Sequence, residues 1–123
     1  MKTKNVTIWH NPRCSKSREA LKILGSIKIE VSIYLYLEQQ PQKKEISKIL
    51  KLLKTNARSI MRKGEILYKN YNLQNITDDS TLIDYMIKNP ILIERPIVVY
   101  ERKAIIGRPP ENILQLFHNT NIS

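Results

Sequence analysis

Apolar and polar residues alternate in two different ways along the first third of the chain. Residues 5–9 ("NVTIW") form an apolar run that predicts a strand. Four apolar residues then recur at helical spacing: Ala20, Leu21, Leu24 and Ile27. Residues 29–38 ("IEVSIYLYLE") alternate strictly, which predicts a second strand with Ile29, Val31, Ile33, Leu35 and Leu37 on one face. Strand, helix and strand in this order predict a parallel crossover.

The middle of the chain has a helical pattern. Pro41 is expected to open a helix whose apolar positions recur every three or four residues: Ile46, Ile49, Leu50 and Leu53. Asn56 is a suitable cap for a short helix over residues 57–63, which Gly64 would end. After a polar loop, residues 77–90 predict a further helix.

The last third of the chain predicts a hairpin and a closing helix. Residues 97–100 ("IVVY") and 104–106 ("AII") are short strand patterns joined by "ERK". Pro110 begins a final helix with apolar residues Ile113, Leu114 and Phe117. The whole order predicts an α/β fold, a small mixed sheet with flanking helices. Its 123 residues suit a single domain over 1–123, with a helical insertion at about 41–90.

Charge and cysteine content limit the possible partners and the cellular compartment of the protein. The net charge of +10 permits an anionic partner, but no helix-turn-helix, zinc-ligand or aromatic-rich strand motif indicates nucleic acid. One cysteine cannot form an internal disulfide, and the first twenty residues lack the apolar core of a signal peptide, so we expect a cytoplasmic protein. No stretch is apolar enough to span a membrane. We expect a monomer.

Cys14, the only cysteine, stands where the first strand gives way to the first helix. A lone cysteine is commonly a small buried hydrophobe, but this one has four basic neighbours: His10, Arg13, Lys16 and Arg18. A helix amino end and nearby cations both favour a thiolate, which is the nucleophilic form. The sequence therefore predicts a reactive cysteine.

His10 and Ser17 are candidates for supporting the sulfur. His10 would contact the thiolate directly or order the loop, and the Ser17 hydroxyl would donate to the sulfur; alternatively, His10 only fills the loop and Ser17 faces solvent. The Cys-x-x-Ser pattern lacks the resolving thiol of a Cys-x-x-Cys redox motif, so any redox cycle needs an external thiol such as glutathione. A phosphatase loop is excluded because Ala20 stands where that motif has arginine, and one cysteine with His10 and His118 makes no zinc site.

Three arginines could complete an anion site. Arg62, Arg95 and Arg108 each lie at the end of an expected element, and the last two precede prolines that fix the backbone. The forked donors of a guanidinium suit tetrahedral oxyanions. Taken singly, each arginine could equally be a surface charge.

Four separated motifs together resemble the glutaredoxin-coupled arsenate reductase family: "HNPRCSKSR", "ARSIMRKGE", "NPILIERPIVV" and "IGRPPE". The resemblance runs over nearly the whole chain. It implies a thioredoxin-like fold with a helical insertion, and a cis peptide bond before Pro96 that brings Arg95 beside the cysteine loop. Ser15 and Lys16 stand where better-characterised members have Gly-Thr, as is typical of a related subgroup.

The resemblance also implies roles for the site residues. Cys14 would attack arsenate, helped by His10 and Ser17, which favour its thiolate. The three arginines, Arg62, Arg95 and Arg108, would hold the oxyanion and the covalent adduct. Glutathione as co-substrate would reduce the arsenic, and glutaredoxin would then reduce the mixed disulfide, with no metal and no bound prosthetic group.

A regulatory protein of the Spx type is the alternative. It has the same fold and binds RNA polymerase rather than reducing a substrate. The positive charge and reactive cysteine would serve either function, whereas the complete arginine set favours the enzyme.

Overall fold

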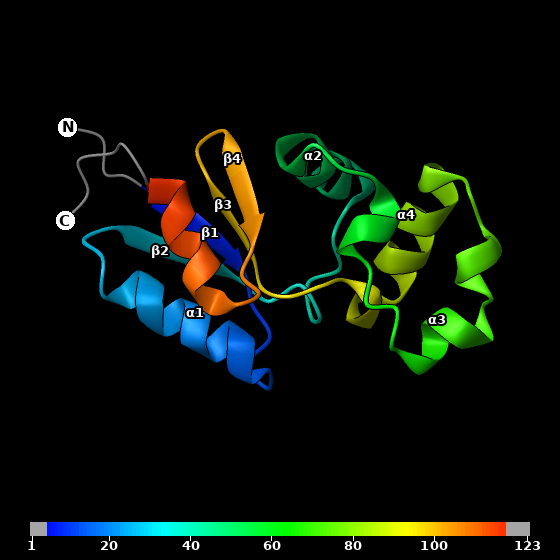
Figure 1. Cartoon of the computed structure of the whole chain (residues 1–123), viewed down its shortest axis with the longest axis horizontal. Coiled ribbons are helices and arrows are strands. Elements are labelled where there is room, and N and C mark those ends of the chain that lie inside the picture. The colour runs from blue at the N-terminus through cyan, green and yellow to red at the C-terminus, as the bar shows by residue number, and fades with distance from the viewer. Residues whose placement is uncertain (1–4, 118–123) are drawn as a thin grey trace. The chain divides into compact units, whose positions relative to one another are not determined.

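A computed structural model describes residues 5–117 of the chain (Figure 1). These residues form two compact units. The sheet unit combines the described residues up to Tyr36 with those from Arg95 onward, and the helical unit comprises Leu37–Glu94. The single domain expected over residues 1–123 stays a prediction.

The sheet unit contains a mixed four-stranded sheet in the order β2-β1-β3-β4. Its strands are β1 (Asn5–Trp9), β2 (Glu30–Tyr34), β3 (Ile97–Tyr100) and β4 (Lys103–Ile106). β1 and β2 are parallel, whereas β1 with β3 and β3 with β4 are antiparallel. The expected α/β class, the parallel crossover and the hairpin are all confirmed.

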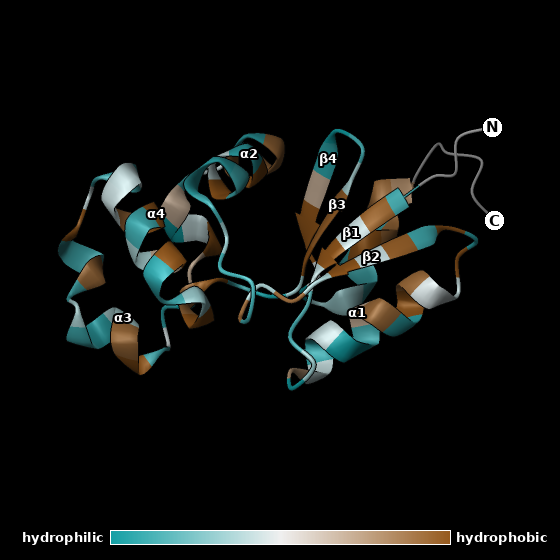
Figure 2. Cartoon of the chain, turned by 180° about the vertical axis from the view of Figure 1, so that it is seen from behind, coloured by the Kyte–Doolittle hydropathy of each residue, from teal (hydrophilic) through white to brown (hydrophobic). Residues whose placement is uncertain are grey.

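Helix α1 (Ser15–Gly25) and the 3-10 helix η4 (Pro110–Phe117) supply the helical side of the sheet-unit core. Side chains alternate between the two faces of a strand, so residues opposite each other in the register share a face. Val6 pairs with Tyr100 and Ile8 with Val98. Eight buried residues form the resulting core: Val6, Ile8, Ala20, Leu24, Val98, Tyr100, Ile113 and Leu116. Apolar residues colour much of β1 and β3 in Figure 2, and the β3–β4 turn is hydrophilic.

The strand register gathers three chain segments at one edge of the sheet. Trp9, the last residue of β1, is opposite Ile97, the first of β3, and Ile97 is opposite Ile106, the last of β4. We call this the Trp9 edge. Three segments adjoin this edge: one follows β1 from His10, one precedes β3 and ends at Pro96, and one follows β4 from Gly107. The register therefore decides which residues lie together there.

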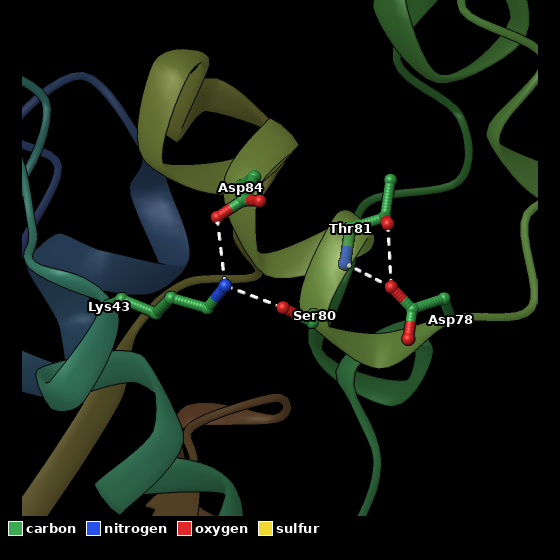
Figure 3. Close-up of polar contacts among 5 residues, drawn as sticks. All are labelled: Lys43, Asp78, Ser80, Thr81 and Asp84. Carbon is green, nitrogen blue, oxygen red and sulfur yellow. Dashed lines mark hydrogen bonds and ion pairs between the residues drawn. The ribbon is translucent and has the colours of Figure 1, made fainter.

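The helical unit contains no strand among its described residues. Its elements are α2 (Lys43–Leu53), η1 (Ala57–Ile60), α3 (Ile66–Asn70), η2 (Leu73–Asn75), α4 (Asp79–Lys88) and η3 (Pro90–Leu92). Lys43 on α2 reaches two residues of α4, because its Nζ lies 3.2 Å from Asp84 Oδ1 and 2.5 Å from Ser80 Oγ (Figure 3). Asp78 caps α4 by accepting the Thr81 N–H at 3.0 Å.

The boundaries of the expected helices need correction in this unit. The second helix begins at Lys43 rather than Pro41, since the Gln42 N–H donates to Glu45 Oε1 at 2.9 Å and starts the helix there. Asn56 caps η1 as expected, with the Ser59 N–H at 3.1 Å from its Oδ1. That helix is one 3-10 turn rather than residues 57–63, because Met61 leaves it to form a bridge with Ile93.

Two short elements lie where a polar loop was expected. α3 and η2 have five and three residues, too few to show a hydrophobic period in the sequence. Arg58 holds this segment by donating to three oxygens: Tyr68 Oη at 2.5 Å, Leu73 O at 3.1 Å and Ile76 O.

The second strand is shorter than its alternation predicts. β2 ends at Tyr34 instead of continuing to residue 38, and Ile33 and Leu37 are 49% and 38% exposed. β2 is an edge strand with a neighbour on one side only, so alternation alone does not bury its apolar residues.

The last helix begins at Pro110 as expected, and it is a 3-10 helix. A 3-10 helix repeats every three residues, so Pro110, Ile113 and Leu116 form its buried row. Leu114, expected among the apolar contacts, is instead 44% exposed.

None of the helices described between residues 5 and 117 is long and apolar enough to cross a bilayer.

Gly107 permits a close approach between β4 and the segment before β3. Its N–H donates to Pro96 O at 2.8 Å. A Cβ at this position would lie 2.9 Å from Pro96 Cγ and 3.1 Å from Ile113 Cγ2. A proline ring has little freedom to withdraw, so a side chain here would push against the backbone beside Arg95.

We expect Gly107→Ala to lower the free energy of unfolding by about 1–3 kcal/mol, the usual cost of overpacking. Urea unfolding measures this change. Gly25→Ala is the matched control, since nothing lies within 4 Å of a Cβ at Gly25 and its stability should be unchanged or slightly raised. Equal stability of the two variants would show that the Pro96 contact is not restrictive.

Candidate active site

Cys14 is the residue at which α1 begins. It occupies the N-cap position with an extended backbone, and the Arg18 N–H donates to its carbonyl at 3.0 Å as the first helical hydrogen bond. The next three backbone N–H groups of such a helix have no partner within the helix, and they favour negative charge beside them. The Cys14 side chain is largely buried, with 8% of the residue exposed. The predicted placement at a helix amino end is therefore confirmed.

The Ser17 hydroxyl ties α1 to the loop that follows β1. Its Oγ lies 2.7 Å from His10 Nδ1 and accepts the Asn11 N–H at 3.0 Å. All three residues are buried, and Ser17 has no exposed surface at all. Within residues 5–117 the Ser17 hydroxyl forms hydrogen bonds with these two partners and not with the sulfur of Cys14. Ser17 does not face solvent, so that alternative is excluded.

The rest of the loop is held by backbone hydrogen bonds and by the side chain of Asn11. The His10 N–H donates to Tyr34 O at 2.9 Å, which continues the pairing of β1 with β2. Asn11 turns the chain, because its side-chain oxygen accepts the Arg13 N–H at 3.0 Å and its carbonyl accepts the Cys14 N–H at 3.0 Å. Asn11 was not singled out from the sequence, although an Asn-Pro pair is a known turn signal.

His10 is a neutral imidazole at neutral pH. Burial in the loop lowers the pKa of His10 below its ordinary value of 6.5, and the positive charge of Arg18 lowers it further. The Ser17 hydroxyl, which accepts the Asn11 N–H, also forms a hydrogen bond with His10 Nδ1, and the imidazole tautomer decides which of these two groups donates. In the folded loop His10 is therefore an uncharged ring that is hydrogen-bonded to Ser17.

Arg95 and Arg108 lie at the Trp9 edge, the edge from which the His10–Cys14 loop also leaves. Arg108 Nη1 donates to the Arg95 carbonyl at 3.1 Å, so the two residues are in contact. The peptide bond between Arg95 and Pro96 is cis, as the family resemblance implied, and the bond between Arg108 and Pro109 is cis as well.

The guanidinium of Arg95 has unused donors. Arg95 is partly buried, and its Nε and Nη1 atoms are shielded from solvent yet have no hydrogen-bond partner in the described part of the chain. Buried N–H groups are normally paired, because leaving one unpaired costs about 1–3 kcal/mol. These donors are therefore available to an acceptor that residues 5–117 do not supply.

Arg62 belongs to the helical unit, and its contacts there are ionic. Its Nη1 lies 2.5 Å from Glu65 Oε2, and its Nε lies 3.9 Å from Glu94 Oε1. The Arg62 N–H also donates to Leu92 O at 2.7 Å, which fixes the backbone. The two glutamates were not identified from the sequence; the spacing of Arg62 and Glu65 by three residues was the available signal.

The described residues lack the ligand set that a metal ion needs. Between residues 5 and 117 there is no group of three histidine, cysteine, aspartate or glutamate side chains able to hold a metal ion. His118 lies outside the described residues.

This chain is similar to known bacterial proteins over most of its length. The Escherichia coli protein YfgD is 48% identical over 116 residues, covering 93% of this chain and 98% of its own length. The arsenate reductase of Haemophilus influenzae is 43% identical over 114 residues, covering 91% and 98%.

A solved structure extends the likeness to the fold. The arsenate reductase from Vibrio cholerae has a TM-score of 0.89 at 42% identity, covering 93% of this chain and 98% of that chain. The expected thioredoxin-like fold is therefore confirmed. The family model described as "ArsC family" matches residues 9–116. The chain belongs to the ArsC family.

Proposed function

We propose that this protein reduces arsenate to arsenite, with Cys14 as the nucleophile. The observation that carries the proposal concerns Arg95. Its Nε and Nη1 are buried without a partner among residues 5–117, at the sheet edge from which the Cys14 loop leaves. A tetrahedral oxyanion carries several acceptor oxygens that could pair with such donors. The arsenate reductases among the relatives support arsenate as that oxyanion.

Before the oxyanion binds, the three arginines differ in the contacts that their guanidinium groups make. Arg95 offers unpaired donors, and Arg108 adds a second guanidinium in contact with the Arg95 backbone. Arg62 is engaged by Glu65 and Glu94 and must exchange part of that contact for the oxyanion. Together they would neutralise the charge of arsenate and of the covalent adduct.

The proposed chemistry uses two thiols. The Cys14 thiolate attacks arsenic, an S–As bond forms, and one arsenate oxygen leaves as water after protonation. A glutathione thiolate then attacks the Cys14 sulfur. The S–As bond breaks with its electron pair moving to arsenic, so As(V) becomes As(III) and a disulfide joins Cys14 to glutathione.

Regeneration of Cys14 needs a further partner. The chain has one cysteine, so it cannot resolve the mixed disulfide internally. Glutaredoxin would accept the glutathionyl group by thiol exchange and return Cys14 to its thiolate form. No metal and no bound prosthetic group takes part in this scheme.

His10 and Ser17 serve the nucleophile indirectly in this proposal. The His10–Ser17 contact holds the loop against α1, so the sulfur stays at the helix amino end. Because His10 is neutral, positive charge for the nucleophile and substrate is left to the backbone N–H groups of α1 and to basic side chains of the site.

We expect Cys14→Ser to abolish arsenite production from arsenate, glutathione and glutaredoxin. Arg95→Ala should reduce kcat/KM by roughly 10- to 100-fold, since it removes two charge-assisted hydrogen bonds. Arg102→Ala, in the exposed β3–β4 turn, is the control that removes the same charge elsewhere on the sheet unit. Undiminished turnover by the Cys14→Ser variant would contradict the proposal.

In a reaction without glutaredoxin, we expect mass spectrometry to find glutathione attached to Cys14.

We expect Glu65→Gln to lower the KM for arsenate roughly threefold, because Arg62 loses a competing carboxylate that is partly exposed to solvent. The kcat should change less. Steady-state kinetics separates these effects, and Glu38→Gln, an exposed carboxylate of the same unit, is the control. An increased KM would instead show that Glu65 positions Arg62 for binding.

We expect protein stability to fall as the pH drops below 6.5. The unfolded chain protonates His10 near 6.5, whereas the folded state, with its lowered pKa, resists protonation, so the full contribution is present above 6.5 and is lost toward the folded pKa. Urea unfolding at several pH values measures this dependence, which His10→Gln should reduce. His118→Gln changes the other histidine and is the matched control; identical pH profiles for both variants would contradict the assignment.

A further inference from the structure

A cavity lies within the helical unit, formed by residues that play no part in the proposed reduction. It has a volume of about 640 Å³. Six residues line it: Arg58, Lys63, Tyr68, Lys69, Asn72 and Gln74. We call it the α3 pocket. Pockets of roughly 300–1,000 Å³ accommodate small organic ligands, so this one is much larger than a single inorganic oxyanion needs.

The lining of the α3 pocket carries positive charge and no negative charge. Arg58, Lys63 and Lys69 are basic, and none of the six residues is acidic. Within the described chain no ion pair involves these three side chains, whereas neighbouring Arg62 is paired with Glu65 and Glu94. The positive charge around the pocket is therefore uncompensated.

Arg58 has a fixed position in this lining. It is partly buried and donates to three neutral oxygens, on Tyr68, Leu73 and Ile76. These contacts fold α3 and η2 around the guanidinium, but they leave its charge without a counter-ion. Keeping an unpaired cation partly out of water costs free energy, which an anionic ligand would offset.

The other lining groups suit the same kind of ligand. Lys63 and Lys69 are exposed and can move their ammonium groups toward phosphate or carboxylate oxygens. Asn72 and Gln74 add side-chain amides that donate hydrogen bonds. A fixed guanidinium with two mobile ammonium groups matches a ligand whose negative charges are spread over several groups.

We propose that the α3 pocket binds an organic anion of nucleotide or short-peptide size that carries at least two phosphate or carboxylate groups. This site is separate in its residues from Cys14 and the three oxyanion arginines. Its occupation therefore does not depend on whether the chain reduces arsenate.

Titration calorimetry of the full chain with two probes tests the proposal. ATP represents phosphate-bearing ligands and glutathione disulfide represents carboxylate-bearing ligands, while adenosine is the uncharged control. We expect saturable binding of at least one anionic probe and none of adenosine. Absence of saturable binding by both anionic probes would overturn the proposal.

Paired variants locate the charge that matters. Lys63→Ala with Lys69→Ala should weaken binding by about tenfold or more, because two charge-assisted contacts are lost. Lys44→Ala with Lys48→Ala removes the same charge from exposed positions of α2 and should have little effect. Equal weakening in both double variants would attribute binding to the general positive field and would contradict a specific site.

Amide chemical shifts measured during the titration identify the position of the ligand. We expect the changes to concentrate over residues 58–74. Changes confined to residues 10–18, 95 and 108 would place the probe at the Cys14 site instead and would refute the α3 pocket.

Discussion

The register of β1, β3 and β4 is the constraint on which the candidate site depends. Trp9, Ile97 and Ile106 stand in one row across three strands, so the residues just beyond them share one edge. A slip of one residue would turn the apolar side chains of a strand to the opposite face and would also shift the segments at its ends. The core that fixes the register, with Ile8 against Val98, therefore also brings the Cys14 loop and two arginines to the same edge.

The chemistry at this edge depends on which polar groups the protein satisfies internally. His10, Ser17 and Asn11 are buried, and each has hydrogen-bond partners within the loop or in α1. Arg95 is the contrast, since two of its donors are shielded but unpaired. Satisfied groups make the loop rigid, whereas unsatisfied donors create an affinity for something from outside. In the proposed function the loop therefore positions Cys14, and Arg95 binds the oxyanion.

Segments with a clear apolar pattern or a capping residue were predictable from the sequence, whereas α3 and η2 were not. The strand over residues 5–9, the helix after Cys14 and the capping role of Asn56 were all expected and are confirmed. α3 is too short to show a period, and the 3-10 type of η4 could not be read from the sequence because three- and four-residue spacings both fit so few turns. The position of Cys14 was predictable because one helix determines it, whereas the contacts of Ser17 and the pairing of Arg62 with Glu65 require knowledge of side-chain directions.

The boundary between the two units falls directly before Arg95 in the chain. The helical unit ends at Glu94 and the sheet unit resumes at Arg95, so one of the proposed substrate arginines is the first residue of the sheet unit after the insertion. Glu94, on the other side of the boundary, is paired with Arg62. An anion held by the Arg95 guanidinium is therefore bound by the residue at which the chain re-enters the sheet unit.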